Sequence, residues 1–138
     1  MVVRLKIRIK RGNKIVETLA IANSGYASRV PEIVVSRNIA EKLNIYPNLP
    51  SGTRVVRYRT ASGRIEEFIR VENCAEVQVI ESDKVSDLVK VNVVISPYIN
   101  ICLLSDKLIS ALKVVLLDPG EGLWCFRDEI SKKIRKSA

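Results

Sequence analysis

The side chains in this sequence that could do acid–base or nucleophilic chemistry are its carboxylates, hydroxyls, lysines and three cysteines. None of the 138 residues is a histidine, which excludes Ser-His-Asp catalysis, Cys-His catalysis and every histidine-ligated metal site. The cysteines Cys74, Cys102 and Cys125 are far apart and form no Cys-x-x-Cys pair. Each lies in an apolar run, so we expect buried thiols rather than nucleophiles, and no metal or cofactor.

The elements that would position reactive groups are mainly strands. Residues 3–10 alternate aliphatic with basic side chains, which predicts a half-buried strand. Gly12-Asn13 predicts a tight hairpin turn. A second strand over 15–22 then runs into a loop that begins Asn23-Ser24-Gly25.

Two short helices and several further strands follow. Ser36 can cap a helix over 37–43 that ends at a left-handed Asn44, and Ser105-Asp106 precedes a helix over 107–112. Ile130 and Ile134 form an i, i+4 pair that predicts a helical tail. The remaining predicted strands are 33–35, 53–60, 64–72, 75–81, 88–95, 114–117 and 123–126. Many short strands with two or three short helices predict a mostly β single domain over 1–138, a closed β-barrel or sandwich.

The order of these pieces resembles the retropepsin-like aspartic proteases, and most closely their small single-domain archaeal and bacterial members. Those members read Asp-Thr/Ser-Gly-Phe, an aliphatic strand, and a helix ending in Leu-Gly-Leu, and the corresponding segments here are 23–26, 32–35 and 39–45. Residues 58–68 resemble the flap hairpin, and 100–105 resemble the hydrophobic Leu-Leu-Gly segment. The resemblance covers about residues 14–127, leaves a basic tail over 128–138, and implies a closed acid-protease barrel.

In that family two chains meet as a homodimer, and each contributes one Asp to a pair that shares a single proton. The resemblance implies catalytic positions at Asn23, Ser24 and Gly25, with the Ser hydroxyl bracing the loop across the dimer axis. It implies peptide-binding positions at Tyr26, Ala61, Ser62 and Gly63, the last three at the tip of a flap that closes over an extended peptide. We expect the apolar face of the first strand to contribute to the dimer, namely Val3, Leu5, Ile7 and Ile9.

The resemblance fails at the catalytic carboxylate, because position 23 is Asn. An amide cannot act as a general base, so we expect an inactive or impaired enzyme. Ser105 replaces the family's Gly, and Asp118 precedes Pro-Gly, where we expect a turn residue rather than a substitute acid. Three interpretations of Asn23 stay open: a naturally inactive relative, an engineered Asp-to-Asn change, and an ordinary loop residue outside the family.

The net charge of +8 supports an alternative function, a small basic β-barrel that binds nucleic acid. Its basic residues cluster in three segments: Arg4, Lys6, Arg8, Lys10, Arg11 and Lys14; Arg54, Arg57 and Arg59; and Lys132, Lys133, Arg135 and Lys136. Aromatic residues make up only 5% of the chain, so a base-stacking platform would be thin. No apolar run is long enough to span a membrane, and we expect a cytoplasmic protein. The scarcity of Gln and Met beside many Lys, Arg and Glu indicates a heat-adapted source.

Overall fold

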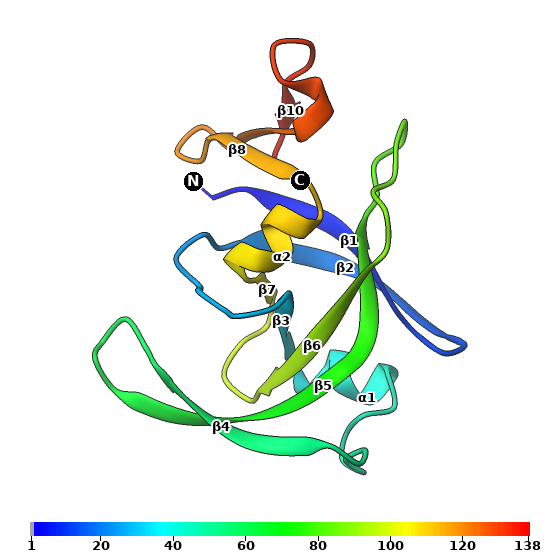
Figure 1. Ribbon diagram of the computed structural model, residues 1–138, viewed down its shortest axis with the longest axis vertical. Helices are drawn as coiled ribbons and strands as arrows, with labels where there is room; N and C mark the ends of the chain where they lie inside the picture. The colour runs from blue at the N-terminus through cyan, green and yellow to red at the C-terminus, as the bar shows by residue number, and fades with distance from the viewer. Residues whose placement is uncertain (1) are drawn as a thin grey trace.

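The computed structural model describes residues 2–138 and consists mainly of strands (Figure 1). The strands are β1 (Arg4–Arg11), β2 (Lys14–Ala22), β3 (Glu32–Ser36), β4 (Thr53–Arg59), β5 (Ile65–Val79), β6 (Val89–Ser96), β7 (Cys102–Leu104), β8 (Val114–Asp118), β9 (Leu123–Phe126) and β10 (Arg135–Lys136). The helices are α1 (Arg37–Lys42), α2 (Asp106–Ala111) and a 3-10 turn, η1 (Arg127–Glu129). No helix among residues 2–138 has the length and apolar character needed to cross a membrane.

The strands close into a barrel. Neighbouring strands follow the order β1-β2-β7-β3-β6-β5, and β5 pairs back onto β1, which makes a closed six-stranded barrel. β4 pairs only with β5, and β8, β9 and β10 form a separate three-stranded sheet. The prediction of a mostly β closed barrel with short helices is confirmed.

The alternating pattern of β1 has the structural role that period 2 predicts, but not the predicted dimer role. Val3, Leu5, Ile7 and Ile9 are each no more than 1% exposed and point into the barrel core. Their basic neighbours face outward, as expected for a strand with one buried face. The expectation that this apolar face contributes to a dimer interface is therefore wrong, because the protomer's own core already covers it.

Both short helices begin where their capping residues predict. The Ser36 hydroxyl accepts a hydrogen bond from the Ile39 backbone N–H at 3.3 Å, and Ser105 does the same for Leu108 at 3.2 Å. Asn44 has a φ of 60°, the left-handed conformation predicted after α1.

β5 is a single strand where the sequence predicted two. We expected separate strands over 64–72 and 75–81, but they form one strand of 15 residues with a bulge between Val71 and Ala75. At the bulge Asn73 has a φ of 46°, and its N–H donates to Asn92 Oδ1 at 3.0 Å. The first half of β5 pairs with β4 and the second half with β1, so the β4–β5 hairpin projects from the barrel, as Figure 1 shows.

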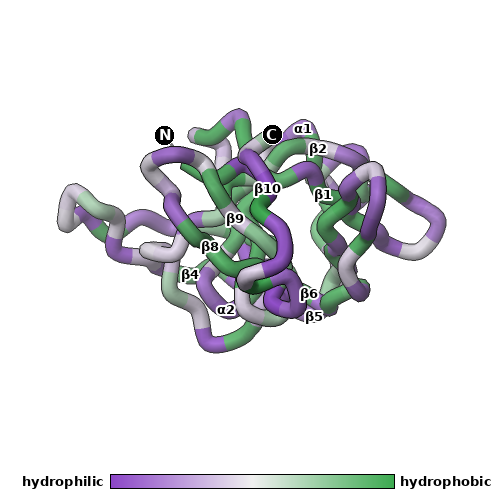
Figure 2. The backbone as a smooth tube through the Cα atoms, turned by 90° about the horizontal axis from the view of Figure 1, so that it is seen from above, coloured by the Kyte–Doolittle hydropathy of each residue, from purple (hydrophilic) through white to green (hydrophobic). Residues whose placement is uncertain are grey.

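The C-terminal tail is not the predicted helix. After η1 the chain continues to the short strand β10, and Ile130 and Ile134 are exposed instead of forming an apolar helix face. The segment around β10 is largely hydrophilic (Figure 2). It is held by a buried charge, since the Arg135 side chain is only 4% exposed.

Arg135 satisfies its donors with three carboxylates. Nε and Nη2 bind Glu129 at 2.9 and 2.8 Å, while Nη1 binds Glu81 at 3.2 Å and Nη1 and Nη2 bind Asp83 at 2.9 Å. The guanidinium also lies 5.8 Å from the centroid of the Trp124 ring. Hydrogen bonds from Arg135 lower the pKa of Glu129 to about 2 and lower the pKa of Asp83 below its ordinary value. The network joins the tail to the loop between β5 and β6.

We predict that Arg135→Met lowers the free energy of unfolding by about 3 kcal/mol, because it leaves partly buried carboxylates without their cation. Lys133→Met is the matched control. It removes a pairing with Asp83 that is about half exposed, and should cost less than about 1 kcal/mol. Denaturant unfolding measures both, and equal effects of the two changes would contradict the assignment.

The same network predicts an acid dependence. Because the pKa of Glu129 is lower in the folded chain than in the unfolded one, its contribution is complete above the ordinary value of 4.5 and is lost as the pH falls through about 2. The unfolding free energy of the unaltered chain should therefore fall across that window. Arg135→Met should flatten this part of the pH curve, and two parallel curves would rule the mechanism out.

Candidate functional site

A cleft of about 420 Å³ lies between the loop after β2 and the β4–β5 hairpin. Asn23, Gly25 and Tyr26 line it from the loop, and residues 58–61 line it from the hairpin. Apolar side chains complete its walls, namely Val34, Phe68, Val94, Ile99 and Leu103. No Asp or Glu is among the residues that line this cleft.

The structure brings four of the seven predicted site residues to this cleft. Asn23, Gly25, Tyr26 and Ala61 line it, although the loop and the hairpin are far apart in the sequence. Ser24, Ser62 and Gly63 do not line it.

Residues 60–64 form the predicted hairpin turn. The Thr60 N–H donates to the Arg64 carbonyl at 2.8 Å. Gly63 has a φ of 83°, which side chains other than glycine rarely adopt. The tip therefore carries little side-chain bulk above the cleft.

Three backbone N–H groups of the Asn23 loop make the hydrogen bonds that fix its shape. The Asn23 N–H donates to the Leu104 carbonyl at 3.2 Å, which fixes the loop to β7. The Gly25 N–H donates to Asn23 Oδ1 at 3.2 Å, and the Tyr26 N–H donates to the Asn23 carbonyl at 3.0 Å. A Cβ at position 25 would lie 3.4 Å from Asn23 Oδ1, which is an ordinary van der Waals contact.

A buried carboxylate, Glu32, joins the two sides of the cleft. Its side chain is 2% exposed, and Oε2 accepts hydrogen bonds from the hydroxyls of Tyr26 and Tyr58, the latter at 2.9 Å. Tyr26 belongs to the Asn23 loop and Tyr58 to the β4–β5 hairpin. The rings of the two tyrosines meet edge to face, with centroids 6.4 Å apart. The hairpin is therefore anchored to the same group as the loop.

This arrangement keeps both tyrosines protonated. Burial, followed by the hydrogen bond to Glu32, raises the pKa of Tyr26 well above its ordinary value. The same causes raise the pKa of Tyr58 to about 12. Neither hydroxyl is a base at neutral or acidic pH.

Arg70 supplies the counter-charge for Glu32. Its Nη1 lies 3.8 Å from Glu32 Oε1, and Nη2 lies 3.4 Å from Glu72 Oε1. Arg70 Nε is the one buried side-chain nitrogen in residues 2–138 that has no hydrogen-bond partner. The ion pair is loose, so the two tyrosine hydroxyls supply the close contacts to the carboxylate.

Ser105 holds the backbone of Glu32 in place. Its hydroxyl accepts from the Glu32 N–H at 3.2 Å while it also caps α2, and its own N–H donates to the Glu32 carbonyl at 3.0 Å. A Gly at this position, as in the retropepsin-like sequence pattern, would have no hydroxyl for these bonds. In the sequence Ser105 is only a departure from the retropepsin-like pattern, and Glu32 is only a charged residue before an aliphatic strand, so neither pattern predicts this role.

Other candidate groups lie in structural positions. Burial raises the pKa of Cys102 to about 12 and raises the pKa values of Cys74 and Cys125, so the prediction of buried thiols holds for Cys102 and Cys125, while Cys74 is half-buried. Asp118 Oδ1 accepts from the Glu121 N–H at 3.3 Å, the predicted turn role. Within residues 2–138 no three Cys, Asp or Glu side chains are grouped to hold a metal ion.

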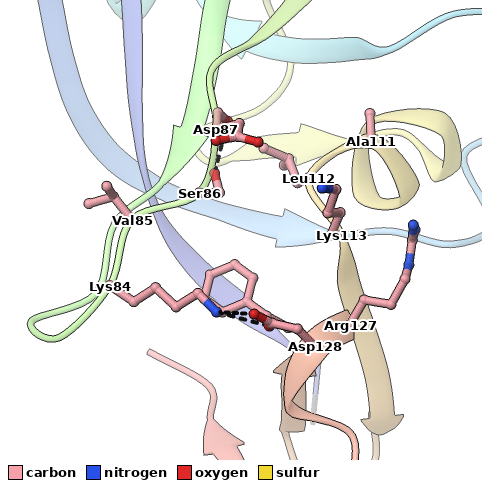
Figure 3. A pocket seen from close by; sticks show the side chains of 10 residues that line it. Lys84, Val85, Ser86, Asp87, Ala111, Leu112, Lys113, Arg127 and Asp128 are labelled. Atoms are coloured by element: carbon pink, nitrogen blue, oxygen red, sulfur yellow. Dashed lines mark hydrogen bonds and ion pairs between the residues drawn. The ribbon is translucent and has the colours of Figure 1, made fainter.

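A second hollow of about 420 Å³ lies where the loop between β5 and β6 meets the end of α2 and of β9 (Figure 3). Its charges are of both signs, and the Lys84 ammonium lies 2.9 Å from both carboxylate oxygens of Asp128. None of the predicted site residues lines it. Because that cation is already paired, we assign no ligand to this hollow.

Comparison with known proteins does not identify a family for this chain. No protein-family model matches the chain, and no curated protein matches its sequence.

We predict that Tyr58→Phe loosens the hairpin without unfolding the barrel. The change removes a hydrogen bond to a charged acceptor, worth about 1.5–3 kcal/mol. Amide hydrogen exchange over residues 55–67 should therefore become at least about tenfold faster. Tyr98→Phe is the matched control, since Tyr98 is 75% exposed. Unchanged exchange in Tyr58→Phe would show that Glu32 does not anchor the hairpin.

Proposed function

We propose that this protein is a retropepsin-like barrel that pairs with a second copy of itself and binds an extended peptide, with proteolysis impaired by Asn23. The observation that supports this most is the cleft itself. It places the Asn23 loop opposite the β4–β5 hairpin, which is the relation of catalytic loop to flap that the sequence resemblance implies.

The chemistry of the cleft suits an extended peptide. Aliphatic and aromatic walls can receive apolar side chains, while Asn23, Thr60 and Ser96 offer groups that hydrogen-bond to a peptide backbone. The hairpin that covers it is anchored at Tyr58 but small at its tip, so peptide entry requires movement of only a few residues.

The loop also has the features that a second copy would use. Ser24 and Gly25 are exposed, and the Ser24 hydroxyl makes no hydrogen bond within residues 2–138. In the retropepsin arrangement this hydroxyl braces the partner's loop. Each protomer contributes one position-23 side chain, so the paired site requires two chains.

Catalysis is impaired because the cleft has no general base. Asn23 cannot accept a proton, no carboxylate lines the cleft, and both tyrosines stay protonated. Glu32 lies behind the tyrosines and accepts a hydrogen bond from each of their hydroxyls. Peptide binding does not require a base, so it is the function that remains.

The alternative function, nucleic-acid binding, has less support. Arg8 in the basic stripe of β1 lies 2.9 Å from Glu17 and donates to Gln78, which neutralises part of the stripe. A DNA or RNA titration at two salt concentrations distinguishes the two functions. Tight binding that falls steeply with salt would favour nucleic acid.

We predict a symmetric dimer at tens of micromolar. Light scattering should give twice the mass of 15.5 kDa, and Ser24→Arg should shift the population toward the monomer by crowding the loops at the axis. Glu121→Arg, in the exposed turn after β8, is the matched control and should stay dimeric. A monodisperse monomer from the unaltered chain would contradict the proposal that two copies form one site.

We predict that Asn23→Asp creates peptidase activity with an acidic optimum. The variant would bring two carboxyls together, one held protonated by its neighbour. Cleavage of an unbiased peptide library should rise by about 10²-fold or more, as expected when a missing general base is restored. Asn48→Asp makes the same charge change in an exposed loop and should stay inactive. A folded, dimeric Asn23→Asp that cleaves nothing reduces the proposal to binding.

A further inference from the structure

Asn23 differs from every other asparagine in the residue that follows it. The chain has Asn at positions 13, 23, 38, 44, 48, 73, 92 and 100, and only Asn23 is followed by Ser or Gly. Asn38, Asn44, Asn92 and Asn100 precede Ile or Val, whose branched side chains crowd the intervening backbone. Asparagine is thermolabile because the next backbone nitrogen can attack its side-chain amide, and a small following residue leaves that path open.

The loop geometry favours this attack at Asn23. The nucleophile would be the backbone nitrogen of Ser24, an exposed residue, and this N–H makes no hydrogen bond within residues 2–138. The Gly25 N–H donates to Asn23 Oδ1, the oxygen that gains negative charge when the amide carbon is attacked. A donor already aimed at a developing oxyanion lowers the barrier of such a step.

We infer that Asn23 is a modification site that deamidates by intramolecular attack of the Ser24 nitrogen. The nitrogen loses its proton and bonds to Asn23 Cγ, the bond between Cγ and the side-chain nitrogen breaks, and ammonia leaves. Water then opens the cyclic imide. Breaking its nitrogen–Cγ bond gives aspartate, and breaking the bond to the backbone carbonyl gives isoaspartate. The net change is amide plus water to carboxylic acid plus ammonia, with no oxidant or cofactor.

The consequence rests on the proposed function. The aspartate product carries a carboxyl group at the position where the paired site lacks one, so ageing of the chain would convert a peptide-binding protein into a peptidase. The modification itself depends only on the Asn23-Ser24-Gly25 loop. The two statements can therefore be tested separately.

The test follows mass and activity together during warm, mildly alkaline incubation of the full-length protein. Trypsin releases residues 15–29, in which Asn23 is the only side-chain amide. This peptide should progressively gain the mass that marks replacement of an amide by an acid. The peptide 43–54 carries the exposed Asn44 and Asn48 and is the internal control. Ser24→Val should slow the gain on the order of tenfold, equivalent to about 1.4 kcal/mol in the barrier, and Asn23→Gln should abolish it.

The possible outcomes separate the modification from the activation. No mass gain in 15–29, or an equal gain in 43–54, overturns the modification whatever the activity of Asn23→Asp. A mass gain that brings activity parallel to the aspartate fraction supports both statements. A mass gain without activity, while Asn23→Asp cleaves peptides, overturns the activation and leaves the modification. An inactive Asn23→Asp overturns the proposed peptidase and leaves the modification standing on its mass evidence.

Discussion

A carboxylate that leaves water must find hydrogen-bond donors and a counter-charge inside the protein. Glu32 finds the donors on two separate segments, Tyr26 of the loop and Tyr58 of the hairpin, and the counter-charge on Arg70. A single buried carboxylate therefore fixes the spacing between the loop and the hairpin, which are the two walls of the cleft. Ser105 fixes the backbone of Glu32 from the other side. Moving either wall alone would leave that charge short of a partner, which is why the cleft can be shaped before any ligand binds.

In the proposed function, the same arrangement separates binding from catalysis. The groups that border the cleft are amides, hydroxyls that stay protonated, and apolar side chains. They can hold a peptide backbone and its side chains but cannot take a proton from water. In the proposed function, catalytic competence therefore depends on one functional group at position 23. The Gly25 N–H donates to the oxygen of that group.

Local rules predicted what depends on local sequence. The alternation of residues 3–10 predicted a strand and its buried face, and Ser36 and Ser105 predicted where the helices begin. The contacts that hold the cleft and the tail could not be predicted, because each network includes at least one contact between residues distant in the sequence. Arg135 reaches Glu81 and Asp83, which are 54 and 52 residues away in the sequence, and these contacts hold the tail in an extended course where the Ile130 and Ile134 spacing favoured a helix. The bulge of β5 reads in the sequence as a break, since Asn73 is a common turn residue.

The most direct measurement of the central claim is a carboxyl-carbon NMR titration of Asn23→Asp with the aspartates isotopically labelled. If two copies meet at this loop, the carboxyls at position 23 share a proton, and the signal should titrate in two separated steps, one of them raised above the ordinary aspartate pKa of about 3.9. A peptide mimic of the transition state should increase the separation. A single step near the ordinary value in the folded variant would show that the two loops do not meet, and would contradict the account.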